Sequence, residues 1–80
     1  FNSETEIVFS MQNQAKVRLV VYNIKGEVVK ELVNSNLAAG EHRILWRGTD
    51  TSGNTVGNGI YYYKMQSGKY TSSGKMVLLK

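Results

Sequence analysis

Apolar and polar residues alternate along most of the chain, and the apolar ones do not recur at the spacing of an amphipathic helix. Valine, isoleucine, threonine and aromatic residues, which favour strands, are frequent in the alternating stretches. We therefore predict an all-β protein without a helix. The expected strands cover residues 5–11, 16–22, 27–33, 41–47, 55–56, 59–66 and 69–80.

Within each expected strand, the alternation separates a face that enters the core from a face that meets solvent. Trp46 and the tyrosines bring the largest apolar surfaces, and their N–H and O–H groups need partners when buried. We expect Trp46 and Tyr61 to be largely buried, and Val77 or Leu79 to be more exposed. The residues predicted to form the core are Val17, Leu19, Val21, Ile44, Trp46, Tyr61, Tyr63, Met65, Met76 and Leu78.

Glycine-containing polar segments separate the strands. Asp50 to Gly53 suits a type I turn, with Asp first and Gly fourth, and Ser67-Gly68 suits a tight two-residue hairpin. A glycine inside a strand pattern, such as Gly74, predicts a bulge or bend, so that Tyr70 and Met76 need not share one alternation. The turn-defining residues are Gly26, Asp50, Gly53, Gly59 and Gly68.

Seven short strands with turns about eight to twelve residues apart are typical of an immunoglobulin-like antiparallel β-sandwich. A small five-stranded barrel is the alternative. The length of 80 residues allows one domain, expected to span residues 1–80. No apolar run approaches the ~20 residues that span a bilayer, so we expect no membrane span.

The chain offers little for catalysis or metal binding. It has no cysteine, its only histidine is His42, and its six carboxylates show no paired spacing. Asp50, Ser52 and Asn54 alternate like calcium ligands, but further acidic ligands are absent, so a turn explains Asp50. We expect no enzyme activity, no catalytic or metal site and no cofactor.

The net charge of +4 is modest and spread along the chain. Three tyrosines and three basic residues nevertheless suggest an aromatic surface that could stack nucleic-acid bases or sugars. Tyrosine is also an ordinary strand residue, half-buried at sheet surfaces. We expect no nucleic-acid partner and leave a carbohydrate ligand open. The residues concerned are Tyr22, Tyr62, Tyr70, Arg18, Lys64 and Lys69.

The segment at residues 75–80 is apolar on both faces and framed by lysines. If Met76 and Leu78 enter the core, the intervening apolar residues face outward. One interpretation is an edge strand that lysine protects against aggregation, and the other is recognition by a second protein through strand pairing. The candidate recognition residues are Lys75, Val77, Leu79 and Lys80.

Several segments occur together in a distinctive order: TEIVFSM, VYNIKGEVV, LAAGEH, WRGTD followed by SGNTV, NGIYYYKM and the terminal GKMVLLK. In these segments the chain resembles the C-terminal sorting domains, or Por secretion tails, of proteins exported by the bacterial type IX secretion system. It is also similar to the related Ig-like domain of the flagellar hook-capping protein. Arg47 is a departure from the sorting domains, which commonly have an acidic or polar residue after the tryptophan.

The resemblance implies a non-catalytic C-terminal domain that directs secretion and cell-surface attachment of a cargo domain preceding it in the same chain. The implied partners are the outer-membrane secretion machinery and sorting peptidase-like proteins, and the implied location is secreted or cell-surface, reached through the periplasm. The alternative is an Ig-like accessory or structural module: a carbohydrate-binding or spacer domain of a secreted enzyme, or a hook-cap-like assembly domain. Cargo, cleavage, oligomeric state and the buried face of the last strand are left open.

Overall fold

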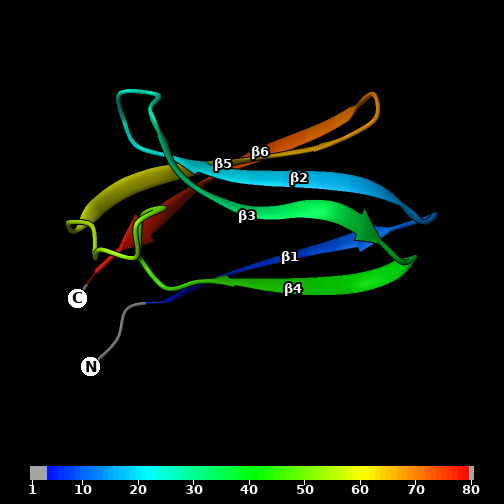
Figure 1. Ribbon diagram of the computed structural model, residues 1–80, viewed down its shortest axis with the longest axis horizontal. Coiled ribbons are helices and arrows are strands. Elements are labelled where there is room, and N and C mark those ends of the chain that lie inside the picture. Colours follow the sequence, from blue (N-terminus) through cyan, green and yellow to red (C-terminus); the bar gives the residue numbers. More distant parts are fainter. Residues whose placement is uncertain (1–3, 80) are drawn as a thin grey trace.

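The computed structural model describes residues 4–79, which form an antiparallel sandwich of two sheets (Figure 1). One sheet pairs β1 with β4, and the other has the order β3-β2-β5-β6. The predicted all-β, immunoglobulin-like class is confirmed, and the separation into two sheets rules out the barrel. No helix in the described residues is long and apolar enough to cross a membrane. The strands are β1 (Thr5–Met11), β2 (Ala15–Tyr22), β3 (Val28–Leu37), β4 (Gly40–Trp46), β5 (Gly59–Ser67) and β6 (Tyr70–Leu78).

Three predicted strands need correction. The strand expected at 55–56 is only an isolated bridge between Thr49 and Thr55. The third strand continues to Leu37, because polar residues 34–36 stay paired with β2 although their composition suggests a loop. The last strand ends at Leu78, so Leu79 lies beyond it, while Lys80 falls outside the described residues.

The core lies between the inner faces of the two sheets. Eight of the ten predicted core residues are buried, and Ile44 and Tyr63 are partly buried and pack against them. Ile7 and Val29 complete the buried cluster. Val20 is also buried, but on the outer face of the central strand β2, where its partners in register are Glu31 and Lys64. Long charged side chains of this kind cover apolar surface with their stems.

Trp46 organises one end of the core. Its side chain is fully buried, and its ring meets that of Tyr61 edge-on, with 5.0 Å between centroids and 66° between planes. Its indole N–H donates a hydrogen bond of 2.9 Å to the Thr49 carbonyl, and the Tyr61 hydroxyl donates one of 2.7 Å to the Gly57 carbonyl. The indole N–H of Trp46 and the hydroxyl of Tyr61 therefore both find their hydrogen-bond acceptors in the loop at residues 47–58. These bonds hold the loop against the sandwich.

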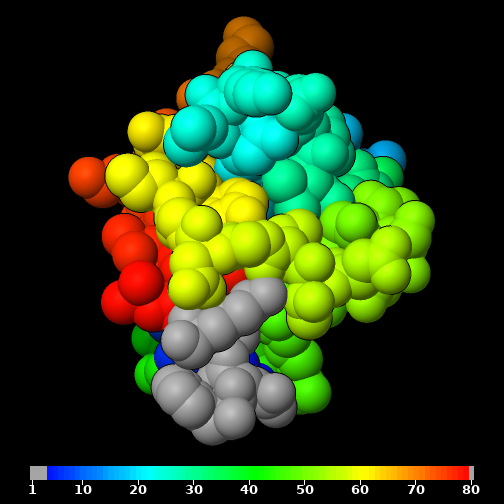
Figure 2. Space-filling view, turned by 90° about the vertical axis from the view of Figure 1, so that its left-hand side faces the viewer, coloured from blue at the N-terminus to red at the C-terminus, as the bar shows by residue number. Residues whose placement is uncertain are grey.

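Two turns at this end of the molecule have the same hydrogen-bond pattern. The side-chain oxygen Oδ1 of Asn23 accepts bonds from the backbone N–H groups two and four residues later, at 2.9 and 3.0 Å. Oδ1 of Asp50 does the same, also at 2.9 and 3.0 Å. Gly26 and Gly53 occupy the fourth position with φ of 82° and 87°, which glycine adopts without steric cost. Figure 2 faces this end of the molecule and shows the first turn in cyan at the top, the second in yellow-green at the right and the end of β6 in red at the left.

Two glycine predictions in the β5–β6 hairpin are wrong in detail. The two-residue turn consists of Gly68 and Lys69, since Ser67 already pairs with Tyr70. At Gly74 there is no bulge, because the register between the strands is unbroken, and the inner-face alternation runs from Tyr70 to Leu78.

Gly74 lies opposite Tyr63, whose ring crosses its backbone. A Cβ atom built on Gly74 would stand only 2.5 Å from Cε2 of that ring. Glycine is therefore used here for a close approach between side chain and backbone, and not for an irregular backbone.

Candidate interaction surface

An exposed apolar area covers part of the outer face of the four-stranded sheet. We define the outer apolar patch as Tyr22, Val28, Ile60, Tyr62 and Val77. Tyr22 pairs in register with both Val28 and Tyr62, and Ile60 pairs with Val77 on the edge strand β6. Of these side chains only Tyr22 is half-buried, whereas Tyr62 is 43% and Val77 54% exposed. Side chains from four strands thus meet in one patch.

Lysines border the outer apolar patch without acidic partners. Lys75 lies next to Tyr62 in register, and Lys64 lies two residues further along β5. After Asp50 the sequence contains no carboxylate side chain. Within residues 4–79, the ion pairs that form use arginine only, so they leave both lysine charges uncompensated. The patch therefore combines apolar contact area with a basic rim.

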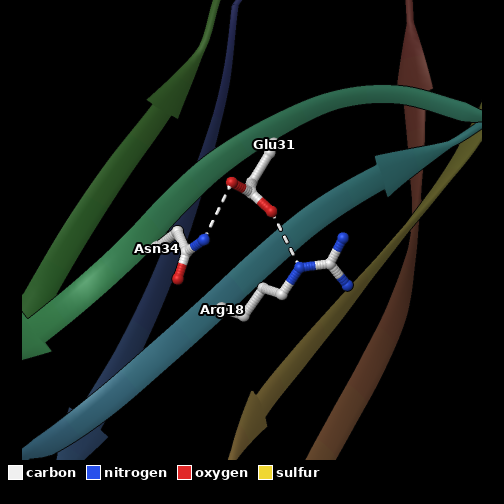
Figure 3. Close-up of polar contacts among 3 residues, drawn as sticks. All are labelled: Arg18, Glu31 and Asn34. Atoms are coloured by element: carbon white, nitrogen blue, oxygen red, sulfur yellow. Dashed lines mark hydrogen bonds and ion pairs between the residues drawn. The ribbon is translucent and has the colours of Figure 1, made fainter.

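The neighbouring part of this sheet is polar and internally paired (Figure 3). Arg18 Nε donates to Glu31 Oε2 at 2.7 Å, and Asn34 Nδ2 donates to Glu31 Oε1 at 3.2 Å. The hydrogen bond from Arg18 holds the pKa of the Glu31 carboxyl below its usual value and raises the pKa of Arg18. Because these groups already satisfy one another, Arg18 is less available to a partner than the two lysines.

The edge strand β6 carries the residues predicted to be recognised by a second protein. Lys75 and Val77 lie on its outer face, and Leu79, 69% exposed, follows its last residue. The remaining candidate, Lys80, lies outside the described residues. Within residues 4–79, β6 is an edge strand with one side that no other strand pairs, where an extended segment could add main-chain hydrogen bonds. The unpaired side of β6 adjoins the outer apolar patch.

The structure separates the three tyrosines that the sequence suggested as one aromatic surface. Tyr22 and Tyr62 are neighbours in register on the outer face. Tyr70 instead shares the inner-face alternation of Met76 and lies at the far end of the β5–β6 hairpin. Val28 and Ile60, which the sequence analysis did not single out, take its place beside Tyr22 and Tyr62. Only the strand order reveals that grouping.

The remaining chemical candidates have structural roles. His42 Nε2 donates a 2.7 Å hydrogen bond to the Ala38 carbonyl, and its ring stacks on Phe9. One oxygen of the Asp50 carboxylate accepts two backbone N–H groups, as described above. Among the described residues no three His, Cys, Asp or Glu side chains gather in a way that could hold a metal ion.

Arg47 stands where the sorting-domain family commonly has an acidic or polar residue after the tryptophan, and its side chain pairs with Glu4. Its Nε lies 3.7 Å from Glu4 Oε2, and both side chains are exposed. An exposed ion pair at this distance contributes little to stability. The following turn is held by Asp50 and by the Trp46 N–H group instead.

The paired sheets, the buried tryptophan and the loops gathered at the sandwich ends define an immunoglobulin-like β-sandwich domain. A family model for the FlgD Ig-like domain matches residues 1–73, and the chain belongs to this family. Residues 74–80, which hold all four predicted recognition residues, lie outside that match. No curated protein matches the chain.

Two solved structures have a similar fold. FlgD from P. aeruginosa is 27% identical over 94% of this chain, with a TM-score of 0.73. FlgD from Xanthomonas campestris, described in connection with the hook capping essential for flagellar assembly, is 24% identical over 96%, also with a TM-score of 0.73. The chain spans 60% and 56% of those two proteins' chains. The resemblance to the hook-capping domain is confirmed, and neither match concerns a type IX sorting domain.

Proposed function

We propose that this chain is a non-enzymatic interaction domain that serves in the assembly of a larger protein complex, as a hook-cap-like Ig domain. The outer apolar patch is the observation that supports this proposal most directly. Tyr62 lies near its centre, between Tyr22 and Lys75 in register, with Ile60 and Val77 in the adjoining row. Aromatic residues at the centre of an apolar area and charged residues at its rim are typical of protein interfaces.

Family membership supports the same role. One relative by fold has been described in connection with hook capping in flagellar assembly. The absence of enzyme activity is part of the proposal. It is supported by His42, whose Nε2 is already bonded to a backbone carbonyl, leaving it poorly placed for proton transfer.

A second candidate function is a secretion tail, in which β6 and the residues after it are recognised by export machinery. The exposed side chains of Val77 and Leu79 on and beyond an edge strand favour this candidate. Its partners would be outer-membrane secretion components and sorting peptidase-like proteins, and its cargo would precede it in the chain. The route would lead through the periplasm to the cell surface or the medium.

The assembly proposal is tested with two matched substitutions in this chain. Tyr62→Ser removes an exposed aromatic ring from the outer apolar patch, and Val8→Ser removes an apolar side chain of similar exposure from the other sheet. We expect Tyr62→Ser to reduce co-purification of the chain with the other proteins of its assembly, and Val8→Ser to leave this co-purification unchanged. Equal incorporation of both variants, each folded by circular dichroism, contradicts the proposal.

The secretion-tail candidate needs a different assay. A reporter protein carrying this chain at its C-terminus is expressed in a bacterium with type IX secretion, and the exported fraction is measured. If the export machinery recognises β6 and the residues after it, removing residues 75–80 or substituting Val77→Lys should retain the reporter in the periplasm. Export at the unmodified level with an intact fold eliminates this candidate and leaves the assembly proposal unaffected.

A further inference from the structure

A hollow of about 420 Å³ opens at the opposite end of the sandwich from the turns at Asn23 and Asp50. It lies where β1 passes into β2 and where the β5–β6 hairpin turns, at the right of Figure 1. Its size falls within the range of about 300–1,000 Å³ that small-molecule pockets occupy. Loops gathered at the ends of a sandwich are common places for binding sites.

Tyr70 supplies the aromatic wall of this hollow. Its position in β6 belongs to the inner face, in line with Met76, but it lies beyond the end of the core and is 60% exposed. A tyrosine turned toward the inside of a sandwich without being buried leaves a large apolar ring surface open to a ligand. Met11 and Ala15 add apolar surface beside it.

The polar side chains around the hollow have no partners elsewhere in the described chain. Ser10, Gln12, Asn13 and Ser67 line it, and their side chains form no hydrogen bond with another residue of the range 4–79. The side-chain amides of Gln12 and Asn13 offer hydrogen-bond donors and acceptors, and each serine hydroxyl can also donate or accept. Among the residues that the structure describes, no charged side chain lines the hollow.

We propose that this hollow binds a neutral sugar unit. A sugar ring presents C–H groups on its faces, which can pack on the Tyr70 ring, and hydroxyl groups at its edge, which the amides of Gln12 and Asn13 can both donate to and accept from. The uncharged lining favours neutral sugars over sulfated or phosphorylated ones, since it offers no charged group to pair with an anion. This site is separate from the outer apolar patch and independent of the assembly role.

The test is an NMR titration of the 80-residue chain with tetrasaccharides of glucose, xylose and N-acetylglucosamine. We expect at least one of them to produce saturable shifts at the amides of residues 10–13 and 67–70. Tyr70→Ala should weaken this binding about tenfold, because it removes the stacking surface. Tyr70→Phe should retain it, because the ring face and not the hydroxyl forms the contact.

Tyr62→Ala is the control, because it removes an exposed tyrosine from the outer face while leaving the hollow intact. It should bind the sugar like the unmodified chain. The proposal is overturned if none of the three sugars shifts these amides at millimolar concentration. It is also overturned if the shifts centre on Tyr62, or if a folded Tyr70→Ala variant binds as well as the unmodified chain.

Discussion

Replacing Gly74 by alanine tests the close approach between β5 and β6. The new Cβ would stand 2.5 Å from Cε2 and 2.7 Å from the hydroxyl oxygen of Tyr63. Non-bonded carbon atoms prefer about 3.5–4.0 Å, so the ring would have to retreat by roughly 1 Å. That ring is partly buried and packs against the buried cluster, so its retreat would disturb this packing. Overpacking of this kind costs about 1–3 kcal/mol.

The loss of glycine works in the opposite direction, because alanine is favoured over glycine in a strand by about 0.5–1 kcal/mol. We therefore expect Gly74→Ala to lower the free energy of unfolding by about 1 kcal/mol. With a urea m-value of about 1 kcal/mol/M for a domain of this size, the midpoint should fall by about 1 M. The fluorescence of the buried Trp46 reports the unfolding transition.

A double-mutant cycle isolates the clash from other effects. In a Tyr63→Ala background the obstructing ring is gone. The effect of Gly74→Ala on the free energy of unfolding should therefore reverse, and the substitution should stabilise the chain by about 0.5–1 kcal/mol. Gly57→Ala is the matched control, because its Cβ would meet no atom within 4 Å, and it should be neutral or slightly stabilising. If Gly74→Ala has the same effect with and without the Tyr63 ring, the reasoning is refuted.

Three further predictions concern the core, a turn and an ion pair. Trp46→Phe should cost about 2–3 kcal/mol in urea unfolding followed by circular dichroism, because it loses the hydrogen bond to the loop and leaves a cavity; a loss below the error of measurement contradicts this. Asp50→Ala should cost about 1 kcal/mol, whereas Asp50→Asn should be nearly neutral, because an amide oxygen fills the same role in the turn at Asn23; equal losses would show that the side-chain oxygen is unimportant. Arg18→Met should bring the lowered pKa of Glu31 back toward its usual value in an NMR titration, and an unchanged midpoint argues against the ion pair. Since the folded pKa is depressed, the stabilisation from Glu31 is present above the ordinary carboxyl pKa and is lost as pH falls through the folded value.

The sequence alone predicted the fold class and the inner faces of the strands at residues 16–22, 41–47 and 59–66. Side-chain alternation is a local property of an extended chain, so Val17, Leu19 and Val21 could be assigned to one face without knowing their partners. Met76 and Leu78 were expected in the core, but the sequence left open which face of the last strand is buried; the structure buries both of them and exposes Val77 and Leu79. The turns at Gly26 and Gly53 were also readable, because positive φ is a local requirement.

Only the tertiary structure decided which of these faces meet. The outer apolar patch exists because β2 and β5 pair, which places Tyr22 beside Tyr62, and that pairing joins segments forty residues apart in sequence. The pairing of β2 with β3 keeps residues 34–36 in a strand despite their polar composition, and the pairing of β5 with β6 sets Tyr63 across Gly74. It also parts Tyr70 from the other two tyrosines and brings it to the hollow beside Gln12. Alternation specifies a face, but neighbours across strands follow from long-range register, which local sequence does not encode.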